Sequence, residues 1–526
     1  YYILIKLLVM GICIDFVLFR WLPGLDSIIR RALALLYVFC VFNAEYYRAP
    51  MWLDVACIFP IVMYGLFQLL LNGKRQIFLW SLTMTAMMSF QHTYMLALMI
   101  LLITGILFFV DKKISKKFTL LLGTTLQAMA LTVIVWIPGI LQIASSKRVG
   151  HNGNIWDVWE SVWLIYPDKW FKLINLGIPI AFILYYIIKN REKRASLFFG
   201  GMLSFLLIPF LFEGSNILWH GGSYQGYPVR FGYMVAFWLI IAGGYAVERM
   251  EERKGAFVFG TLSFACLLLV FFIQMQPNSK AKIELIFACI LGEIVAGFLL
   301  CIAGKQKMKV ILAAYAVVQA IILVSNCWIY AEDIGGNCVT ICEKVEEKKK
   351  ELINSDTPID RIKSKSIITN NYPLAMQEAA ISSYLAVASQ EEQNMLVSLG
   401  YASVGDRLTD YGGTLFSDMV MGIKSIFSTE EENDVLYTRT GQVDQWKFYQ
   451  SKYKYELGIL LENEGEINWR EGNVFANQNQ LAELITGEEL FNVKEENSNC
   501  ISIITQPNSV LYLYSPQMRD VRTITV

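Results

Sequence analysis

The chain has 526 residues, 55% of them hydrophobic, and a mean hydropathy of +0.43. This composition excludes an ordinary soluble enzyme of this size, because apolar stretches long enough to span a bilayer recur along the first 330 residues. Lys plus Arg and Asp plus Glu both total 45, so the global charge does not indicate nucleic-acid binding. Most of the ten Cys lie in apolar runs, and no disulfide framework is visible.

Twelve apolar segments are predicted to span the membrane. They lie near 1–19, 28–43, 52–71, 76–90, 94–110, 118–144, 173–189, 196–213, 231–247, 255–273, 283–302 and 309–328. The stretch 76–110 has basic connections at both ends, which favours a hairpin that turns at Gln91, His92 and Thr93.

Lys and Arg alternate between connections in a way that predicts the topology. The basic connections contain Arg20/Arg30/Arg31, Lys74/Arg75, Lys112/Lys113/Lys116/Lys117, Lys189/Arg191/Lys193/Arg194, Arg249/Arg253/Lys254 and Lys305/Lys307/Lys309. The positive-inside rule places this set in the cytoplasm. Tyr1 then lies outside, so an odd number of spans, taken as one, is expected to precede it.

The remaining sequence differs in kind. Residues 1–328 form the predicted multi-span core, and residues 329–526 are rich in Glu, Asn, Lys and Ser with strand-like runs such as SVLYLYS. The fold class is therefore a polytopic α-helical membrane protein with a C-terminal extracytoplasmic α+β domain. The chain begins inside an apolar segment and closes within a strand-like alternation, so both ends are expected to be truncated.

The predicted topology gathers polar and aromatic residues on the outer side. They are His92, His151, His220, Asp54, Glu45, Arg230, Trp52, Trp219, Tyr224 and Tyr227. Interfacial anchoring accounts for most of the aromatic residues, and each His taken singly is as well explained by a structural role. Asp54 is harder to dismiss, because a carboxylate at the end of an apolar span is costly unless it is paired or lies in a cavity.

Several kinds of chemistry leave no trace in the sequence. There is no Walker A motif, no G-x-G-x-x-G, no zinc spacing and no nucleophile elbow. An outward-facing transferase has no nucleotide pool to use, so a lipid-phosphate-linked sugar is the donor that fits. Its phosphate suits Arg230, and an acidic residue can act as base toward an acceptor hydroxyl. Asp15 and Glu293 lie within spans and mark either an ion path or polar contacts between helices.

Five stretches together carry a family resemblance: APMWLDVACIFPIVMYGLFQLL (49–70), NILWHGGSYQGYPVRFGYM (216–234), YGGTLFSDMVMGIKSIFS (411–428), YELGILLENEGEINW (455–469) and NVFANQNQLAELITG (473–487). In their order and spacing the chain resembles the bacterial YfhO-like membrane proteins, of the GT-C class of polyprenyl-phosphate-dependent glycosyltransferases. The resemblance implies a multi-span core, an outer C-terminal domain, and sugar transfer to a cell-envelope polymer such as a teichoic or lipoteichoic acid. It also implies a catalytic carboxylate in a first outer loop, expected upstream of Tyr1.

The residues that match the motifs are Trp52, Asp54, Asn216, Trp219, His220, Tyr227, Pro228 and Arg230. We expect Asp54 and His220 to act in catalysis. We expect Arg230, Trp52, Asn216, Trp219, Tyr227, Glu45 and His92 to bind substrate. No cofactor or metal is expected, because no outer cluster of three carboxylates is evident. A lipid or sugar transporter and an envelope-polymer binding or assembly scaffold remain the alternative functions.

Overall fold

The computed structural model describes residues 2–47, 49–110, 112–145, 173–189, 193–221, 229–249, 280–303, 307–325, 343–344, 347, 360–365, 371–384, 388–402, 407–453, 467–470, 472–492, 510–514 and 521–525. The chain divides into two compact units. A helical unit comprises Tyr1–Ile140 and His151–Ala331, and a second unit comprises Leu141–Gly150 and Glu332–Val526.

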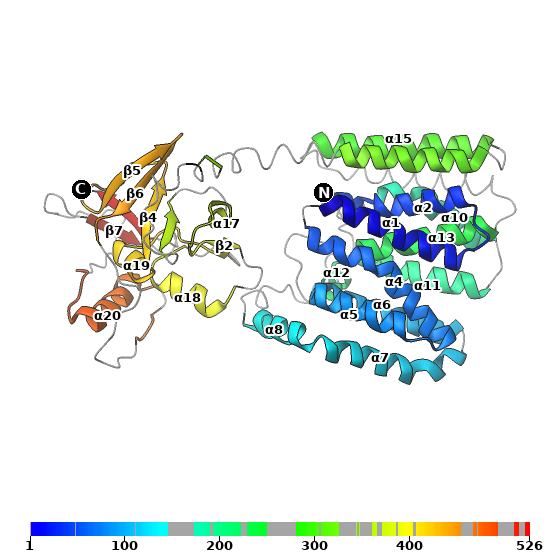
Figure 1. Cartoon of the computed structure of the whole chain (residues 1–526), viewed down its shortest axis with the longest axis horizontal. Helices are drawn as coiled ribbons and strands as arrows, with labels where there is room; N and C mark the ends of the chain where they lie inside the picture. The colour runs from blue at the N-terminus through cyan, green and yellow to red at the C-terminus, as the bar shows by residue number, and fades with distance from the viewer. Residues whose placement is uncertain are drawn as a thin grey trace. The chain divides into compact units, whose positions relative to one another are not determined.

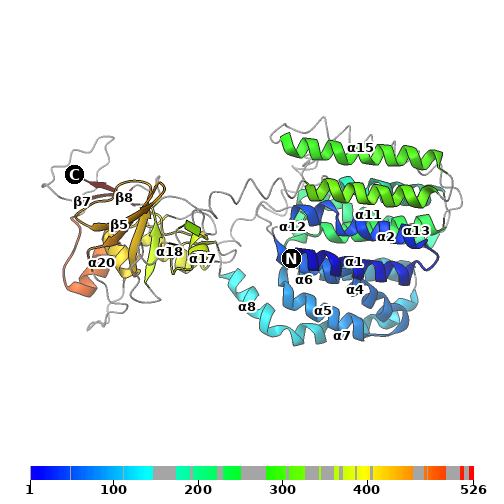
Figure 2. The same ribbon diagram turned by 45° about the horizontal axis from the view of Figure 1, so that its top comes forward.

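The first unit is a bundle of helices (Figures 1 and 2). Its elements are α1 Tyr2–Trp21, α2 Ser27–Val38, α3 Val41–Glu45, α4 Pro50–Asn72, α5 Gln76–Met88, α6 Phe90–Val110, η1 Lys112–Lys117, α7 Phe118–Leu131, α8 Val133–Ala144, η4 Ile174–Leu176, α10 Gly177–Lys189, α11 Lys193–Leu211, α12 Glu213–Trp219, α13 Gly232–Arg249, α15 Lys280–Ile302 and a helix over Lys307–Ser325. Among the described residues, seven helices are long and apolar enough to cross a membrane, or up to eight if the bent pair α7 and α8 is one span. The predicted multi-span helical class is confirmed.

The predicted hairpin over 76–110 exists, but its turn lies elsewhere. The helix break falls at Ser89, which has extended backbone and separates α5 from α6, so Gln91, His92 and Thr93 lie inside α6. A Cβ on Gly73, before α5, would lie 3.1 Å from Nζ of Lys117, after α6, so the chain returns to the same end. The polar triplet suggested a turn, but His92 and Thr93 are buried and hydrogen-bond to Ser89 at the helix break instead of facing solvent.

The centre of the helical unit is α13, which packs against α2, α4, α10 and α11. Almost all of its residues are buried, including the large rings of Tyr233, Phe237 and Trp238. Gly243 allows α10 to approach closely, because a Cβ there would lie 2.9 Å from Cα of Pro179. The core is thus built around one helix whose whole circumference is apolar.

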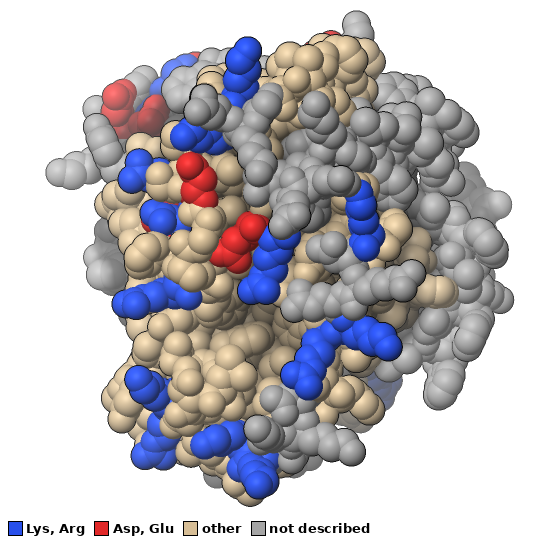
Figure 3. All heavy atoms as spheres, turned by 90° about the vertical axis from the view of Figure 1, so that its right-hand side faces the viewer, with Lys and Arg blue, Asp and Glu red and all other residues tan. Residues whose placement is uncertain are grey.

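One end of the helical unit is strongly basic. Lys and Arg predominate over Asp and Glu on the face shown in Figure 3. Contacts across this end join distant segments: Glu248 accepts a hydrogen bond from the amide of Gly24 (2.7 Å), and Lys309 lies 3.7 Å from Asp26. The described parts of three basic connections, around Arg20, Arg249 and Lys309, therefore meet at this end.

The second unit contains a four-stranded mixed sheet in the order β1-β4-β6-β5. Its strands are β1 Arg361–Ser364, β4 Ile423–Ser428, β5 Tyr437–Val443 and β6 Trp446–Ser451; β1 is parallel to β4 and the other pairs are antiparallel. Two-stranded pairs join β2 Ser383–Tyr384 to β3 Arg407–Leu408 and β7 Val510–Tyr514 to β8 Val521–Thr525. The helices are α17 Tyr372–Met376, α18 Gln390–Ser398, α19 Leu415–Val420 and α20 Val474–Thr486. The predicted mixture of helices and strands is confirmed.

A buried polar network holds this second unit together. Nζ of Lys363, on β1, donates to both carboxylate oxygens of Asp418 at 2.7 and 2.9 Å. Tyr401 donates to the same carboxylate, and Tyr372 donates to Asp410. All five side chains are buried, so the loss of one partner leaves an uncompensated polar group in the interior.

We expect Lys363→Met to destabilise the second unit by about 3–5 kcal/mol, because Asp418 would keep a buried charge without its partner. Lys344→Met is the matched control: its ion pair with Asp444 has the same 2.7 Å separation but both side chains are about half exposed. That change should cost less than about 1 kcal/mol. Hydrogen exchange at the β4 amides of the intact protein measures both effects, and equal losses would contradict the role of burial.

Asp410 should make the stability of the second unit depend on pH. Burial raises the pKa of its carboxyl from 3.8 to about 6, against the opposing effects of the Tyr372 hydroxyl and the Lys363 charge. Because the folded-state pKa is the higher one, the stabilisation is complete below about pH 3.8 and is lost as pH rises through about 6. Relative to Asp410→Asn, the wild type should therefore lose stability between about pH 4 and 6 in the same exchange measurement. A constant difference across that interval would refute this.

Candidate functional site

The predicted site residues that the structure describes lie at the end of the helical unit opposite the basic face. There α4 begins with Pro50, followed by Trp52 and Asp54. Two residues along an α-helix correspond to a rotation of roughly 200°, so these two side chains leave α4 in nearly opposite directions. The region consequently has two parts, one around Trp52 and one around Asp54.

The Trp52 cluster, defined as Trp52, Arg230, Tyr46, His92 and Tyr233, draws its members from distant segments. The Arg230 guanidinium lies 5.0 Å from the centre of the Trp52 ring, a cation–π contact. Tyr46 meets Trp52 edge to face at 4.7 Å, and His92 lies 6.1 Å from Trp52 and 6.0 Å from Tyr233. A buried guanidinium beside aromatic faces is suited to a ligand that carries both an anionic group and a ring: the guanidinium binds the anionic group, and the aromatic side chains contact the ring.

His92 carries a free hydrogen-bonding position within this cluster. Its Nδ1 lies 3.0 Å from the Ser89 hydroxyl, and its buried Nε2 has no hydrogen-bond partner among the described residues. A buried unsatisfied nitrogen is rare in folded proteins and needs a physical explanation. A ligand atom reaching the Trp52 cluster would supply the missing partner.

Hydrogen bonds tie together the two ends of the loop between α12 and α13. The Asn216 side chain accepts from the amide of Val229 (3.2 Å), and Nε2 of His220 accepts from the amide of Arg230 (3.2 Å). Nδ1 of His220 therefore carries the proton and donates to the carbonyl of Asn216 at 2.6 Å. In this state both ring nitrogens of His220 hold backbone groups, so His220 positions Arg230.

The backbone just before Arg230 is strained. Val229 has φ of +59°, a left-handed conformation that β-branched residues strongly avoid. Such a conformation costs on the order of 1–3 kcal/mol and is found mainly where a ligand site or switch requires it. The Asn216 hydrogen bond to Val229 helps to hold this geometry.

Trp219 belongs to the packing of this end. Its ring is buried and stacks on Phe231 with ring centres 4.7 Å apart. Tyr94 of α6 donates a hydrogen bond to the neighbouring carbonyl of Leu218 at 2.9 Å. These contacts fix α12 to the bundle and so support the loop whose ends His220 joins.

Asp54 faces a different partner, Lys6 of α1. Nζ of Lys6 lies 2.6 Å from the Asp54 carboxylate and donates to the carbonyl of Pro50 at 2.7 Å. The carboxylate side chain stays 27% exposed, whereas that of Lys6 is 7% exposed. The sequence reasoning missed Lys6, although a lone Lys inside the apolar run YYILIKLLVM was a usable signal.

Lys6 and Asp54 lie in the wall of a groove between α1, α4 and α5 with a volume of about 650 Å³. The rest of its lining is mainly apolar, including the exposed side chains of Ile5, Trp80 and Met84. The groove therefore combines one ionic group with a long hydrocarbon-compatible surface.

The remaining predicted residues are less informative. Glu45 ends α3 and is exposed. Tyr227, Pro228 and His151 lie outside the described residues. No group of three His, Cys, Asp or Glu suited to a metal ion occurs in the described part of the chain.

The two carboxylates within spans each have local partners. Asp15 accepts from Nε of Arg30 at 2.8 Å. Glu293 is buried and accepts from the Gly177 amide at 3.1 Å and from the Tyr315 hydroxyl. Of the two interpretations given above, polar contacts between helices describe both residues.

Comparison with known proteins gives one informative match. No curated protein sequence matches the chain. Two crystal structures of ArnT from Cupriavidus metallidurans are similar in fold: the apo state with 12% identity and a TM-score of 0.44, and the complex with undecaprenyl phosphate with 10% and 0.46. The similarity covers 85% of this chain and 82% and 83% of those chains, respectively. The model of the family described as bacterial membrane protein YfhO matches residues 1–512. This match confirms the resemblance found in the sequence, and the chain belongs to the YfhO family of bacterial membrane proteins.

Proposed function

We propose that this protein is an integral membrane glycosyltransferase that moves a sugar from a polyprenyl-phosphate carrier to an extracytoplasmic cell-envelope acceptor. The observation that carries the proposal is the pairing of Lys6 and Asp54 within an apolar groove, at the end of the bundle remote from the basic face. An ionic group at the polar end of a hydrocarbon-lined surface is what a lipid phosphate requires.

In the proposed donor complex, the isoprenyl chain lies along the apolar wall formed by α1, α4 and α5. Lys6, at the polar end of that wall, attracts the phosphate. The sugar extends past the N-terminus of α4 toward the Trp52 cluster, where Arg230 and the unsatisfied His92 nitrogen supply hydrogen bonds. Aromatic rings in that cluster provide stacking surfaces for the sugar.

The proposed chemical step breaks the bond between the anomeric carbon and the phosphate oxygen. The acceptor hydroxyl oxygen forms the new bond to that carbon, and polyprenyl phosphate leaves with the bonding electron pair. Asp54 takes the hydroxyl proton or orients the hydroxyl, because its carboxylate lies 2.6 Å from Nζ of Lys6 and remains partly accessible. His220 keeps Arg230 in place during this step.

We propose a teichoic or lipoteichoic acid as the acceptor, on the basis of the family resemblance, with the C-terminal unit outside the cell holding the polymer. A lipid or sugar transporter is the main competitor. It needs ionisable groups along the full bilayer depth, and the only two mid-span carboxylates considered for that role, Asp15 and Glu293, already have partners. An acceptor-binding scaffold without catalysis is the other competitor.

We expect Asp54→Asn to lower sugar transfer by about 10²–10⁴-fold, the usual range for loss of a general base. The assay follows a labelled polyprenyl-phosphate sugar into polymer in vesicles that contain the protein. Asp15→Asn is the matched control, because it removes a similar ion pair (2.8 Å to Arg30) outside the groove that Lys6 and Asp54 line and should leave transfer unchanged.

Two other results would count against the proposal. Transfer that survives Asp54→Asn, His220→Ala and Arg230→Ala would remove the site assignment. Movement of labelled lipid between leaflets without label in polymer would favour the transporter.

The orientation makes a separate prediction. In a background without native Cys, Met51→Cys at the start of α4 should react with an impermeant maleimide in intact cells, because Met51 is 56% exposed at the proposed outer end. Lys116→Cys, exposed on η1 near the basic face, should react only after permeabilisation. The reverse pattern would place the site in the cytoplasm and would exclude the proposed donor side.

A further inference from the structure

The apolar groove between α1, α4 and α5 ends at a pair of aromatic rings. Its lining includes the Lys6–Asp54 pair at the polar end and continues along α1 as far as Cys13. About one turn beyond Cys13, Phe16 of α1 meets Tyr64 of α4 edge to face, with ring centres 5.2 Å apart. Neither of these two residues lines the groove. The Phe16–Tyr64 pair therefore closes the space between α1 and α4 at the end remote from the ionic pair.

The three helices stay in close contact beyond this pair. Trp21 of α1 packs against Phe67 of α4, with ring centres 5.0 Å apart. Between α4 and α5, a Cβ on Gly65 would lie 2.6 Å from the backbone nitrogen of Phe78, so the two backbones touch. A chain that follows the groove away from Lys6 has no continuation between the helices past this level.

The length of the groove follows from helix geometry. From Lys6 to Phe16 along α1 is roughly 15 Å, and from Asp54 to Gly65 along α4 is roughly 16 Å, at 1.5 Å per residue. An isoprenyl unit adds four carbon–carbon bonds of about 1.5 Å, or roughly 5 Å when it is extended. The groove therefore has room for about three units between the ionic pair and the aromatic pair.

We propose that this groove contacts only about the first three isoprenyl units of the carrier, and that the Phe16–Tyr64 pair directs the next unit out into the bilayer. The inference rests on the proposed function, in which the carrier phosphate lies at Lys6. The open side of the groove suits such an exit, because Trp80 and Met84 line it and are exposed. Phe16 and Tyr64 are then the residues that set how much of the carrier the protein recognises.

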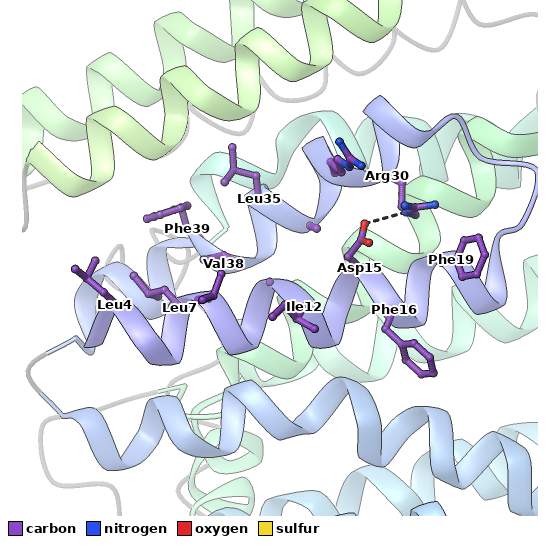
Figure 4. A pocket seen from close by; sticks show the side chains of 14 residues that line it. Leu4, Leu7, Ile12, Asp15, Phe16, Phe19, Arg30, Leu35, Val38 and Phe39 are labelled. Atoms are coloured by element: carbon purple, nitrogen blue, oxygen red, sulfur yellow. Dashed lines mark hydrogen bonds and ion pairs between the residues drawn. The ribbon is translucent and has the colours of Figure 1, made fainter. Parts of the chain in front are cut away.

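Phe16 lies beside a second groove, which supplies a control residue. This groove lies between α1 and α2, has a volume of about 920 Å³, and is lined by both Phe16 and Phe19. In Figure 4, Asp15 points toward Arg30, whereas Phe16 points away from it. Phe19 lines the second groove only, so it is an aromatic residue of the same helix that lies off the proposed path of the carrier.

Native mass spectrometry of the full chain with geranyl, farnesyl or geranylgeranyl phosphate tests the proposal. These probes differ by one isoprenyl unit each, and equal mole fractions in the detergent micelle keep the apolar surroundings of the free probes alike. We expect farnesyl phosphate to be retained about threefold better than geranyl phosphate, because its third unit gains dispersion contacts with the groove walls. Geranylgeranyl phosphate should be retained no better than farnesyl phosphate.

Two variants should remove this limit. In Phe16→Ala, and separately in Tyr64→Ala, geranylgeranyl phosphate should be retained about threefold better than farnesyl phosphate, because the groove then extends to a fourth unit. Phe19→Ala is the matched control and should keep the wild-type order. Retention that rises with the fourth unit in the wild type, or the same change in Phe19→Ala as in Phe16→Ala, would overturn the proposal.

Photocrosslinking gives an independent readout of position. A diazirine on the terminal unit of farnesyl phosphate should label α1 near Cys13 or α4 near Ile61, the lining residues closest to the aromatic pair. Label confined to the region of Met88, beside the polar end, would contradict the proposed direction of the chain.

The failure of this inference can be told apart from the failure of the proposed function. A length limit without sugar transfer in the vesicle assay would support this inference and reject the transferase. Transfer without a length limit would do the opposite. Retention of none of the three phosphates would overturn both the inference and the proposed donor site.

Discussion

Hydrocarbon cannot solvate an ion, and this constraint organises the helical unit more than any single contact. The ionisable residues discussed within its spans have partners supplied by another helix or segment: Lys6 with Asp54, Asp15 with Arg30, and Glu293 with Gly177 and Tyr315. Each pair joins elements that the apolar surfaces alone would leave free to slide. The same rule accounts for the predominance of Lys and Arg over Asp and Glu at one end of the bundle, where water and headgroups solvate them.

The proposed site depends on how α4 divides its side chains between two surroundings. Trp52 faces the interior, where Arg230 and His92 surround it, and Asp54 faces α1 and the groove. Asn216 and His220 join the two described ends of the loop before α13 through backbone groups. The Arg230 guanidinium is therefore held inside the bundle because neutral side chains hydrogen-bond to the backbone of Val229 and Arg230.

Much of this arrangement follows from sequence patterns, but the reasons differ between spans, strands and contacts between helices. Apolar length and Lys and Arg placement predict the spans and the basic face, because the bilayer imposes both regardless of tertiary detail. The strand at Val510–Tyr514 follows from alternation in the same direct way. Contacts between helices do not follow from local patterns in this way. No neighbouring residue indicates that Lys6 meets Asp54, forty-eight positions away, or that both ring nitrogens of His220 bond to backbone groups. The polar triplet at Gln91 misled because His92 and Thr93 are buried and bond to Ser89, at the helix break itself.

The contact between Gly243 and Pro179 has a mechanical consequence. With the backbones of α10 and α13 closer than a methyl group would allow, sliding one helix along the other would drive the Pro179 ring into α13. Helices α10 and α13 are therefore expected to move as one rigid unit at the centre of the bundle. The grooves along α1 can widen or narrow without a change in this central packing.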